Sequence, residues 1–294
     1  MDNLATPYHG LRDWRRVAVQ GNPGNYAHMA VQKIYPDAKV MFYATFEDAA
    51  AAVPHEADGA LLPIENNTMG RVGDIHHLLP HLTLYVVAEV YQPITHCLLA
   101  PKGATLQTLK VAYSQWPALA QCPQTLKALG LKPMPTADTA GAAKDVAARG
   151  DITEAAIASR LAGKIYGLEV IKEGVNDKPN NTTRFVALGP VMHVPDHAET
   201  IKFSLMFGVK NQPGSLVKAL EAFALNGINL TKLESYDDTA RFSLTHFYAE
   251  GEGNLAGEGL NGGVRKAIET LKNRAEWVKE LGFYVPESMP NINI

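Results

Sequence analysis

The chain has 294 residues, 46% of them hydrophobic, so it is long enough to bury two or three separate cores. Thirty acidic and 27 basic residues leave a formal charge of −3, which argues against nucleic acid or an anionic membrane as a partner and favours a small molecule. No run approaches the roughly 18 apolar residues of a membrane span, and residues 1–16 lack the apolar core of a signal peptide. We therefore expect a soluble, cytoplasmic protein. Cys97 and Cys122 stand in apolar patterns, which predicts buried free thiols.

Short β-branched runs alternate with helical patterns from Val17 onward. The expected strands are 17–20, 39–43 and 60–64, and the helices that follow them are 26–35, 46–53 and 74–80. This order predicts a parallel sheet covered by helices. Two apolar strands, 82–90 and 94–100, come next, and the second is expected to carry the chain out of this lobe.

A second α/β lobe is expected over the next seventy residues. It comprises a strand at 111–114, helical spacing of Leu119, Cys122, Leu126 and Leu129, a helix capped by Asp138, and the runs 154–158 and 161–166. Strands at 168–171 and 185–188 then lead back to the first lobe. Two lobes with double crossovers predict a cleft, where small-molecule sites tend to form.

A smaller unit follows a linker at 191–199. Its expected elements are strands 201–207, 228–236, 242–250 and 277–285, with one helix opened by Pro213 and a second marked by Val264, Ala267, Ile268 and Leu271. The order βαββαβ predicts a ferredoxin-like fold. The Gly-rich interval 251–263 predicts a loop.

Polar side chains gather where apolar strands are expected to begin or end. Asn180–Phe185 reads Asn-Asn-Thr-Thr-Arg-Phe and precedes an apolar run, while Pro63–Thr68 places amides and a hydroxyl after a strand. Open α/β sheets bind ligands at such strand ends. Taken alone, Asn180–Phe185 favours a capped loop with a surface arginine, and the rest of the chain is what favours a binding site. Gly21–Tyr26 predicts either an anion site at a helix start or a tight turn.

Other catalytic classes lack their motifs. His77 and His81 have a metal-ligand spacing, but no Glu lies between them as in a metalloprotease, so neither a metal nor a cofactor is expected. The chain has no Gly-x-Ser-x-Gly elbow and no Gly-x-x-x-x-Gly-Lys phosphate loop. Hydrolase and NTPase interpretations are therefore disfavoured.

In this order, the motifs resemble those of prephenate dehydratase, an enzyme family of phenylalanine biosynthesis. The resemblance covers residues 17–286, and its signature is Asn181-x-Thr183-Arg184-Phe185. It is supported by Pro63-Ile64-Glu65-Asn66, by Ser114 with Ala118–Cys122, and by Asp138–Ala143. It implies a two-lobed catalytic unit like that of periplasmic binding proteins, joined to a ferredoxin-like ACT domain. The implied division is an extension at 1–16, a catalytic domain at 17–190 (lobe 1 about 17–97 and 172–190, lobe 2 about 98–171), a linker at 191–199, an ACT domain at 200–286 and a tail at 287–294.

The resemblance also implies residue roles. Thr183 is the expected proton donor to the leaving hydroxyl of prephenate, and Arg184 is expected either to bind the side-chain carboxylate or to act structurally between the lobes. The implied substrate contacts are Asn66, Asn67, Ser114, Gln121, Thr182, Arg184 and Phe185. The implied site for phenylalanine, the allosteric effector, comprises Asn211, Pro213, Gly214, Ser215, Leu216, Asn229, Leu230, Glu234 and Ser235. ACT domains commonly assemble through their sheets, which implies a homodimer or homotetramer.

The sequence departs from the family pattern at several motif positions. Tyr236-Asp237 replaces the usual Arg-Pro, Ser215 replaces Ala, Gln115 replaces His, Asn67 replaces Ser, and Asn25-Tyr26-Ala27 replaces Thr-Phe-Ser. The motifs do not separate prephenate dehydratase from arogenate dehydratase, which performs the same chemistry on the transaminated substrate. A solute-binding protein or an amino-acid-responsive regulator is less favoured, because the former would not need the appended unit and the latter would need a DNA-binding unit.

Overall fold

The computed structural model describes residues 14–195, 200–237, 245–254 and 263–287. The chain divides into two compact units. One contains Trp14–Leu78 and Val90–Val186, and the other contains Leu79–Glu89 and Ala187–Ser288. None of the helices in the described ranges is long and apolar enough to cross a membrane.

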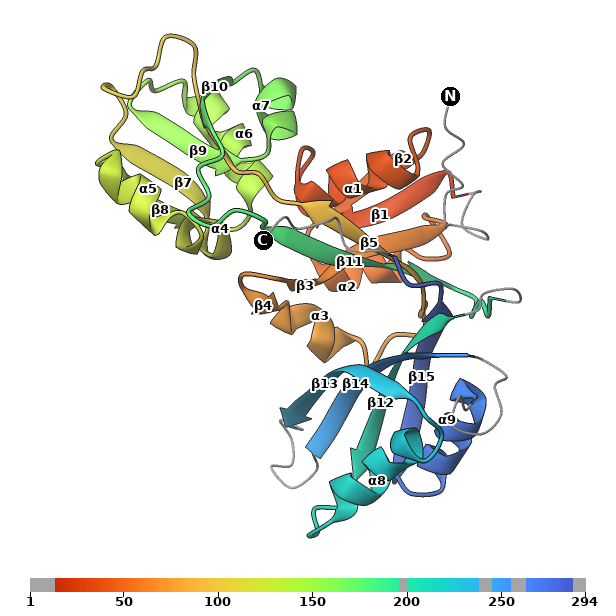
Figure 1. Cartoon of the computed structure of the whole chain (residues 1–294). Coiled ribbons are helices and arrows are strands. Elements are labelled where there is room, and N and C mark those ends of the chain that lie inside the picture. The colour runs from red at the N-terminus through yellow and green to blue at the C-terminus, as the bar shows by residue number, and fades with distance from the viewer. Residues whose placement is uncertain (1–13, 196–199, 238–244, 255–262, 288–294) are drawn as a thin grey trace, which may run out of the picture. The chain divides into compact units, whose positions relative to one another are not determined.

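The first sheet of the chain has the strand order β2-β1-β3-β11-β5, with β4 paired to β3 (Figure 1). Its strands are β1 (Arg16–Gln20), β2 (Lys39–Tyr43), β3 (Gly59–Asn66), β4 (Gly70–Arg71), β5 (Tyr85–Pro93) and β11 (Thr182–Gly189), and its helices are α1 (Tyr26–Ile34), α2 (Phe46–Ala51) and α3 (Gly73–Leu78). β1 pairs in parallel with both β2 and β3, as the alternating pattern predicts. Side chains cap two of these helices: Asn25 accepts from the His28 amide, and Thr45 from the Asp48 amide.

The second sheet has the order β10-β6-β9-β7-β8. Its elements are β6 (Cys97–Ala100), β7 (Val111–Gln115), α4 (Trp116–Ala120), α5 (Pro123–Ala128), β8 (Lys132–Thr136), α6 (Thr139–Arg149), β9 (Glu154–Ala158), α7 (Arg160–Tyr166) and β10 (Glu169–Glu173). The single helical pattern through Leu119–Leu129 is wrong, because Pro123 cannot continue α4 and instead begins α5. Strand β8 was also missed in the sequence, because Pro133 and Pro135 are unusual in a strand. Prolines are tolerated in edge strands, and β8 is an edge strand of this sheet.

The C-terminal unit contains β12 (Ile201–Val209), α8 (Ser215–Ala224), β13 (Asn229–Asp237), β14 (Thr245–Gly253), α9 (Val264–Lys272) and β15 (Trp277–Tyr284). Its strand pairs are antiparallel and its order is β13-β14-β12-β15, which is the ferredoxin-like arrangement. Phe203, Phe207 and Phe223 lie in the core between sheet and helices. β14 extends to Gly253, so the predicted loop begins later than expected. Residues 255–262 of that loop and 238–244 of the predicted hairpin lie outside the described residues.

The sheet face that carries Lys202 holds a second, polar cluster. Lys202 lies 2.9 Å from Glu89 and 3.7 Å from Glu250, measured between Nζ and carboxylate oxygens. Tyr248 donates to Glu250, and the Ser204 and Tyr284 hydroxyls are 3.0 Å apart. All six of these side chains are buried. The predicted fold class is confirmed: a two-lobed α/β unit of the periplasmic-binding-protein type precedes a ferredoxin-like unit.

Candidate active site

A cavity of about 400 Å³ lies between the two lobes of the catalytic unit. Residues from strand ends and helix starts on both lobes surround it. They include Gln20, Asn25, Tyr26, Asn66, Met69, Arg71, Asp74, His96, Gln115, Gln121, Asp138, Thr139, Thr183 and Phe185. Sequence reasoning placed the polar strand ends together, and the cavity is where they meet. Most of the polar side chains around it are uncharged amides and hydroxyls.

The strand β11 presents alternate side chains to opposite sides. Thr183 and Phe185 line the cavity, whereas Thr182 and Arg184 do not. Arg184 is only 2% exposed, and its Nε donates to Glu65 Oε1 at 2.6 Å. The guanidinium is thus already paired with a carboxylate of the neighbouring strand. This geometry favours the structural alternative for Arg184 over binding of a substrate carboxylate.

Asn66 sets the direction of the hydrogen bonds around Thr183. Its Oδ1 accepts from the backbone amides of Thr68 and Met69, both at 2.9 Å, so its Nδ2 must act as a donor. That Nδ2 donates to Asn181 Oδ1 at 2.7 Å and to Thr183 Oγ1 at 3.0 Å. Because the Thr183 oxygen accepts here, its own proton can point to the cavity. No residue in the described ranges accepts that proton.

A chain of hydrogen bonds continues from Asn66 into the second lobe. Gln121 Nε2 donates to Thr68 Oγ1 at 2.9 Å and to Asn66 Oδ1 at 3.3 Å. Its Oε1 therefore faces His96 Nε2 at 2.8 Å, and His96 Nδ1 lies 2.8 Å from the Tyr26 hydroxyl. His96 Nε2 must carry a proton to donate to Gln121 Oε1, so the neutral ring accepts at Nδ1. The single proton of the Tyr26 hydroxyl is shared between His96 Nδ1 and the Thr95 carbonyl oxygen, which lies 3.0 Å away.

Burial keeps His96 neutral. Desolvation lowers its pKa to about 4, and the hydrogen bond with Gln121 opposes that effect only in part. Sequence reasoning missed both His96 and Tyr26. The available signal was a histidine beside an apolar strand, next to Cys97 and two residues after Ile94, where an unpaired polar side chain would be costly.

Two other residues that were expected to contact the substrate form hydrogen bonds within the protein instead. Ser114 is fully buried and donates to the Ile157 carbonyl at 2.7 Å, so Gln115 and not Ser114 lines the cavity. Asn67 binds the start of β11, with Nδ2 donating to the Asn180 carbonyl at 2.6 Å and Oδ1 accepting from the Thr182 amide at 2.9 Å. Its amide therefore shapes the loop before Thr183.

The segment after β1 is a tight turn at the wall of the cavity. Asn25 caps α1, and Gly24 has a φ of +93°. A Cβ on Gly24 would lie 2.6 Å from the Ala162 Cα, so only glycine fits this close approach between lobes. Asn22 Nδ2 donates to Asp138 Oδ2 at 2.6 Å, also joining the lobes. The turn interpretation accounts for these residues.

His76 and His77 lie in α3, and His81 follows it. His76 is buried, with Nε2 3.1 Å from the Ile64 carbonyl. Across the residues that the structure describes, no three His, Cys, Asp or Glu side chains come close enough together to hold a metal ion.

Comparison with known proteins identifies the family of the chain. The family model described as prephenate dehydratase matches residues 17–192. The chain belongs to the prephenate dehydratase family. It is 38% identical to the bifunctional N-acyl-homoserine lactone acylase/prephenate dehydratase of Komagataeibacter europaeus, over 92% of this chain and 95% of that protein. It is 37% identical to arogenate dehydratase/prephenate dehydratase 2 of Arabidopsis thaliana, over 92% of this chain and 72% of that protein.

A solved member of the family has the same fold. Prephenate dehydratase from Arthrobacter aurescens, in complex with L-Phe, superimposes with a TM-score of 0.83 at 25% identity, covering 92% of this chain and 89% of that one. The family model does not extend over the C-terminal unit, so the ACT assignment of that unit rests on the motifs.

The expected effector residues lie at the start of α8 and along β13. Gly214 adopts φ +81° just before α8, and Leu216 and Leu230 pack partly against the core. A bulge in β13 puts Ser235 opposite Phe247, which is in the core, and Glu234 opposite Tyr248 on the other face. The nine residues therefore do not all face one side of the sheet. Asn211, Pro213, Ser215 and Asn229 flank the turn and the strand start.

Proposed function

We propose that the chain is a prephenate dehydratase, which converts prephenate to phenylpyruvate with loss of water and CO2. The observation that supports this best is the Thr183 hydroxyl, held as an acceptor by Asn66 at 3.0 Å on the wall of a cavity of about 400 Å³. A hydroxyl fixed in this way has its proton directed to the bound molecule.

The reaction makes specific demands on the site. The ring C–O bond breaks, the hydroxyl takes up one proton and leaves as water, and the ring carboxylate leaves as CO2 while its bonding electrons enter the ring. One prephenate dianion and one proton thus give the phenylpyruvate anion, water and CO2. The site needs a donor at the hydroxyl and little stabilisation of the ring carboxylate, because that charge disappears in the reaction.

Thr183 meets the first demand by hydrogen-bonding the leaving oxygen as charge develops there. Asn66 Nδ2 stabilises the Thr183 oxygen as its proton moves toward the substrate. Gln121 and His96 hold Asn66 and Thr68 in place from the second lobe. The amides and hydroxyls that make up most of the polar lining agree with the second demand.

Arogenate is the alternative substrate, since several relatives are named arogenate dehydratases. The discriminating experiment is to incubate purified protein with prephenate and, separately, with arogenate. Phenylpyruvate from the first supports the proposal, whereas phenylalanine from the second alone reassigns the substrate. Absence of both products under saturating substrate would refute dehydratase activity.

The relative from K. europaeus raises a second activity, hydrolysis of an N-acyl-homoserine lactone. Its support here is the full-length similarity. The two thiols are poor candidates for a nucleophile, because burial raises the pKa of Cys122 to about 12 and also raises that of Cys97. Release of fatty acid from such a lactone, measured beside prephenate turnover and in Thr183→Ala, tests whether one site serves both.

Regulation by L-phenylalanine is part of the proposal. It is supported by the ferredoxin-like unit with its Asn211–Leu216 and Asn229–Ser235 motifs, and by the solved relative in complex with L-Phe. Tyr236, which replaces the usual Arg, donates a hydrogen bond to Glu234 at 3.0 Å. Millimolar L-phenylalanine should inhibit the full chain and raise its unfolding temperature. Neither effect is expected if the unit serves assembly alone.

A further inference from the structure

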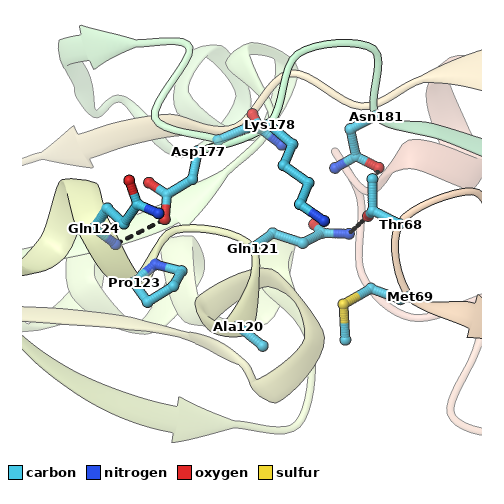
Figure 2. Close-up of a pocket in the computed structure, with 10 residues that line it drawn as sticks. Thr68, Met69, Ala120, Gln121, Pro123, Gln124, Asp177, Lys178 and Asn181 are labelled. Atoms are coloured by element: carbon cyan, nitrogen blue, oxygen red, sulfur yellow. Dashed lines mark hydrogen bonds between the residues drawn. The ribbon is translucent and has the colours of Figure 1, made fainter.

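A second cavity, of about 170 Å³, adjoins the catalytic amides, and Figure 2 shows it. Met69 and Gln121 border both this cavity and the larger one. The other residues around the smaller cavity are Thr68, Ala120, Pro123, Gln124, Asn176, Asp177, Lys178 and Asn181. Its volume exceeds the roughly 30 Å³ that a water molecule occupies in the liquid, so it can hold a polar group of several atoms.

Asn181 directs an unsatisfied donor into this cavity. It is 5% exposed, and its Oδ1 accepts from Asn66 Nδ2 at 2.7 Å. Because backbone amides fix Asn66 Nδ2 as a donor, the Asn181 amide cannot be turned over. Its Nδ2 is therefore left on the cavity side, where it is buried and has no hydrogen-bond partner among the described residues.

Asn176 repeats the same arrangement. Its Oδ1 accepts from the backbone amide of His96 at 2.7 Å, which fixes the orientation of its side chain. Its Nδ2 is also buried without a partner in the described part of the chain. Two buried amide donors without a partner among the residues around one small cavity are unusual, because an unmade buried hydrogen bond is costly.

Lys178 adds a positive charge to these donors. Figure 2 shows its side chain reaching toward Gln121, with the Asn181 side chain facing the same space. The one acid at this cavity, Asp177, is turned to the start of α5, where it accepts from the amides of Gln124 and Thr125 at 2.7 and 2.9 Å. Its charge is thus satisfied by a helix start.

Resting on the proposed function, we infer that this cavity binds the side-chain carboxylate of the substrate, through Lys178 Nζ and the Nδ2 groups of Asn176 and Asn181. Two N–H donors and a cation form the complement of a carboxylate. Asn66 links this subsite to the reacting centre, because it donates to both Asn181 and Thr183. Arg184 is less suited to this contact, since it is buried and already pairs with Glu65.

The choice between the two carboxylates of prephenate follows from the reaction. A cation beside the ring carboxylate would stabilise a charge that is lost as CO2, and so would slow the reaction. The side-chain carboxylate persists in the product, and a cation there contributes equally to substrate and transition state. Such uniform binding lowers KM without changing kcat greatly.

Lys178→Gln tests the inference, with Lys172→Gln on the exposed edge strand β10 as the matched control. KM for prephenate should rise about ten- to a hundred-fold in Lys178→Gln, with a much smaller fall in kcat, because a hydrogen bond to a charged group is lost. Lys172→Gln should leave both constants as in the wild type. Asn181→Asp keeps the acceptor for Asn66 but places a negative charge at the subsite, and should raise KM further.

Phenylpyruvate, which retains only the side-chain carboxylate, separates this subsite from the proposed function. Its inhibition constant should rise in parallel with KM in Lys178→Gln. An active wild type whose KM and phenylpyruvate inhibition are both unchanged in Lys178→Gln and Asn181→Asp would overturn the subsite while leaving the dehydratase assignment intact. A wild type that turns over neither prephenate nor arogenate, yet binds phenylpyruvate in calorimetry with the same Lys178 dependence, would retain the carboxylate subsite and overturn the function.

Discussion

The protein buries two polar clusters of opposite character. The cluster around Asn66, in the catalytic unit, consists of neutral amides and hydroxyls with a histidine kept neutral by burial. The cluster around Lys202, in the C-terminal unit, contains one lysine and two carboxylates. Donors of the neutral cluster face cavities, whereas the charged groups of the other cluster pair with each other. The unsatisfied donors support the proposed binding site, whereas the mutually paired charges support a structural role.

The largest expected effect is on the neutral cluster, in Thr183→Ala. Loss of the donor hydroxyl should lower kcat by roughly 10²–10⁴-fold, with a smaller change in KM, because the hydroxyl acts mainly in the transition state. Steady-state kinetics with prephenate measures this. Thr183→Ser keeps the hydroxyl and should retain most of the turnover. Near-normal kcat in the alanine variant would remove Thr183 from the mechanism.

In the charged cluster, Lys202→Met should act on stability. It leaves Glu89 and Glu250 buried with like charges and without their cation, at a cost of about 3–5 kcal/mol in the free energy of unfolding. Chemical denaturation of the C-terminal unit measures the loss. Lys210→Met, on an exposed lysine just after β12, should change little. Equal stability of the two variants would show that the cluster does not contribute to the free energy of unfolding.

Acidification should destabilise the neutral cluster by protonating His96. Its folded pKa of about 4 lies below the value of about 6.5 in the unfolded chain. Between these values the unfolded chain binds a proton that the folded chain excludes, so the contribution is constant above pH 6.5 and stability falls as the pH drops toward 4. The full loss is about 3 kcal/mol, at 1.36 kcal/mol per pKa unit. Urea unfolding from pH 7 to pH 4 should show a steeper decline in wild type than in His96→Gln, and parallel curves would contradict the shift.

The sequence was most informative where polar residues sit next to one another. Asn66, Thr183 and Gln121 were expected together, because strand ends of an α/β sheet converge. It was harder to predict which side chains of a strand face the cavity. Ser114 and Gln115 are neighbours, and only the register of β7 with β9 decides which lines the cavity. Tyr26 and His96 are 70 residues apart, so their hydrogen bond has no signature in the chain.

The fold shows the same division. Alternating β-branched runs and helical spacing predicted both α/β lobes and the ferredoxin-like unit, because those patterns are local. The break between α4 and α5 and the edge strand β8 were missed, since each depends on how a proline is used in three dimensions. The unsatisfied amides of Asn176 and Asn181 could not be predicted either, because the orientation of each side chain is set by hydrogen-bond partners distant in sequence.

The smallest expected effect distinguishes the two roles considered for Arg184. If Arg184 is structural, Arg184→Lys keeps the charge but loses the planar group that pairs with Glu65, and the cost is about 1–3 kcal/mol in the stability of the catalytic unit. The unfolding temperature should then fall by about 2–12 °C, at about 2–4 °C per kcal/mol for a unit of this size, while KM for prephenate stays within about twofold of wild type. Lys178→Gln provides the opposite pattern, with a raised KM and an unchanged unfolding temperature, because Lys178 is exposed and has no partner among the described residues. Differential scanning calorimetry and steady-state kinetics on the same two preparations measure both quantities. A large rise in KM at constant stability for Arg184→Lys would indicate that Arg184 binds the substrate carboxylate. In that case the ion pair between Arg184 and Glu65 would have to break when substrate binds.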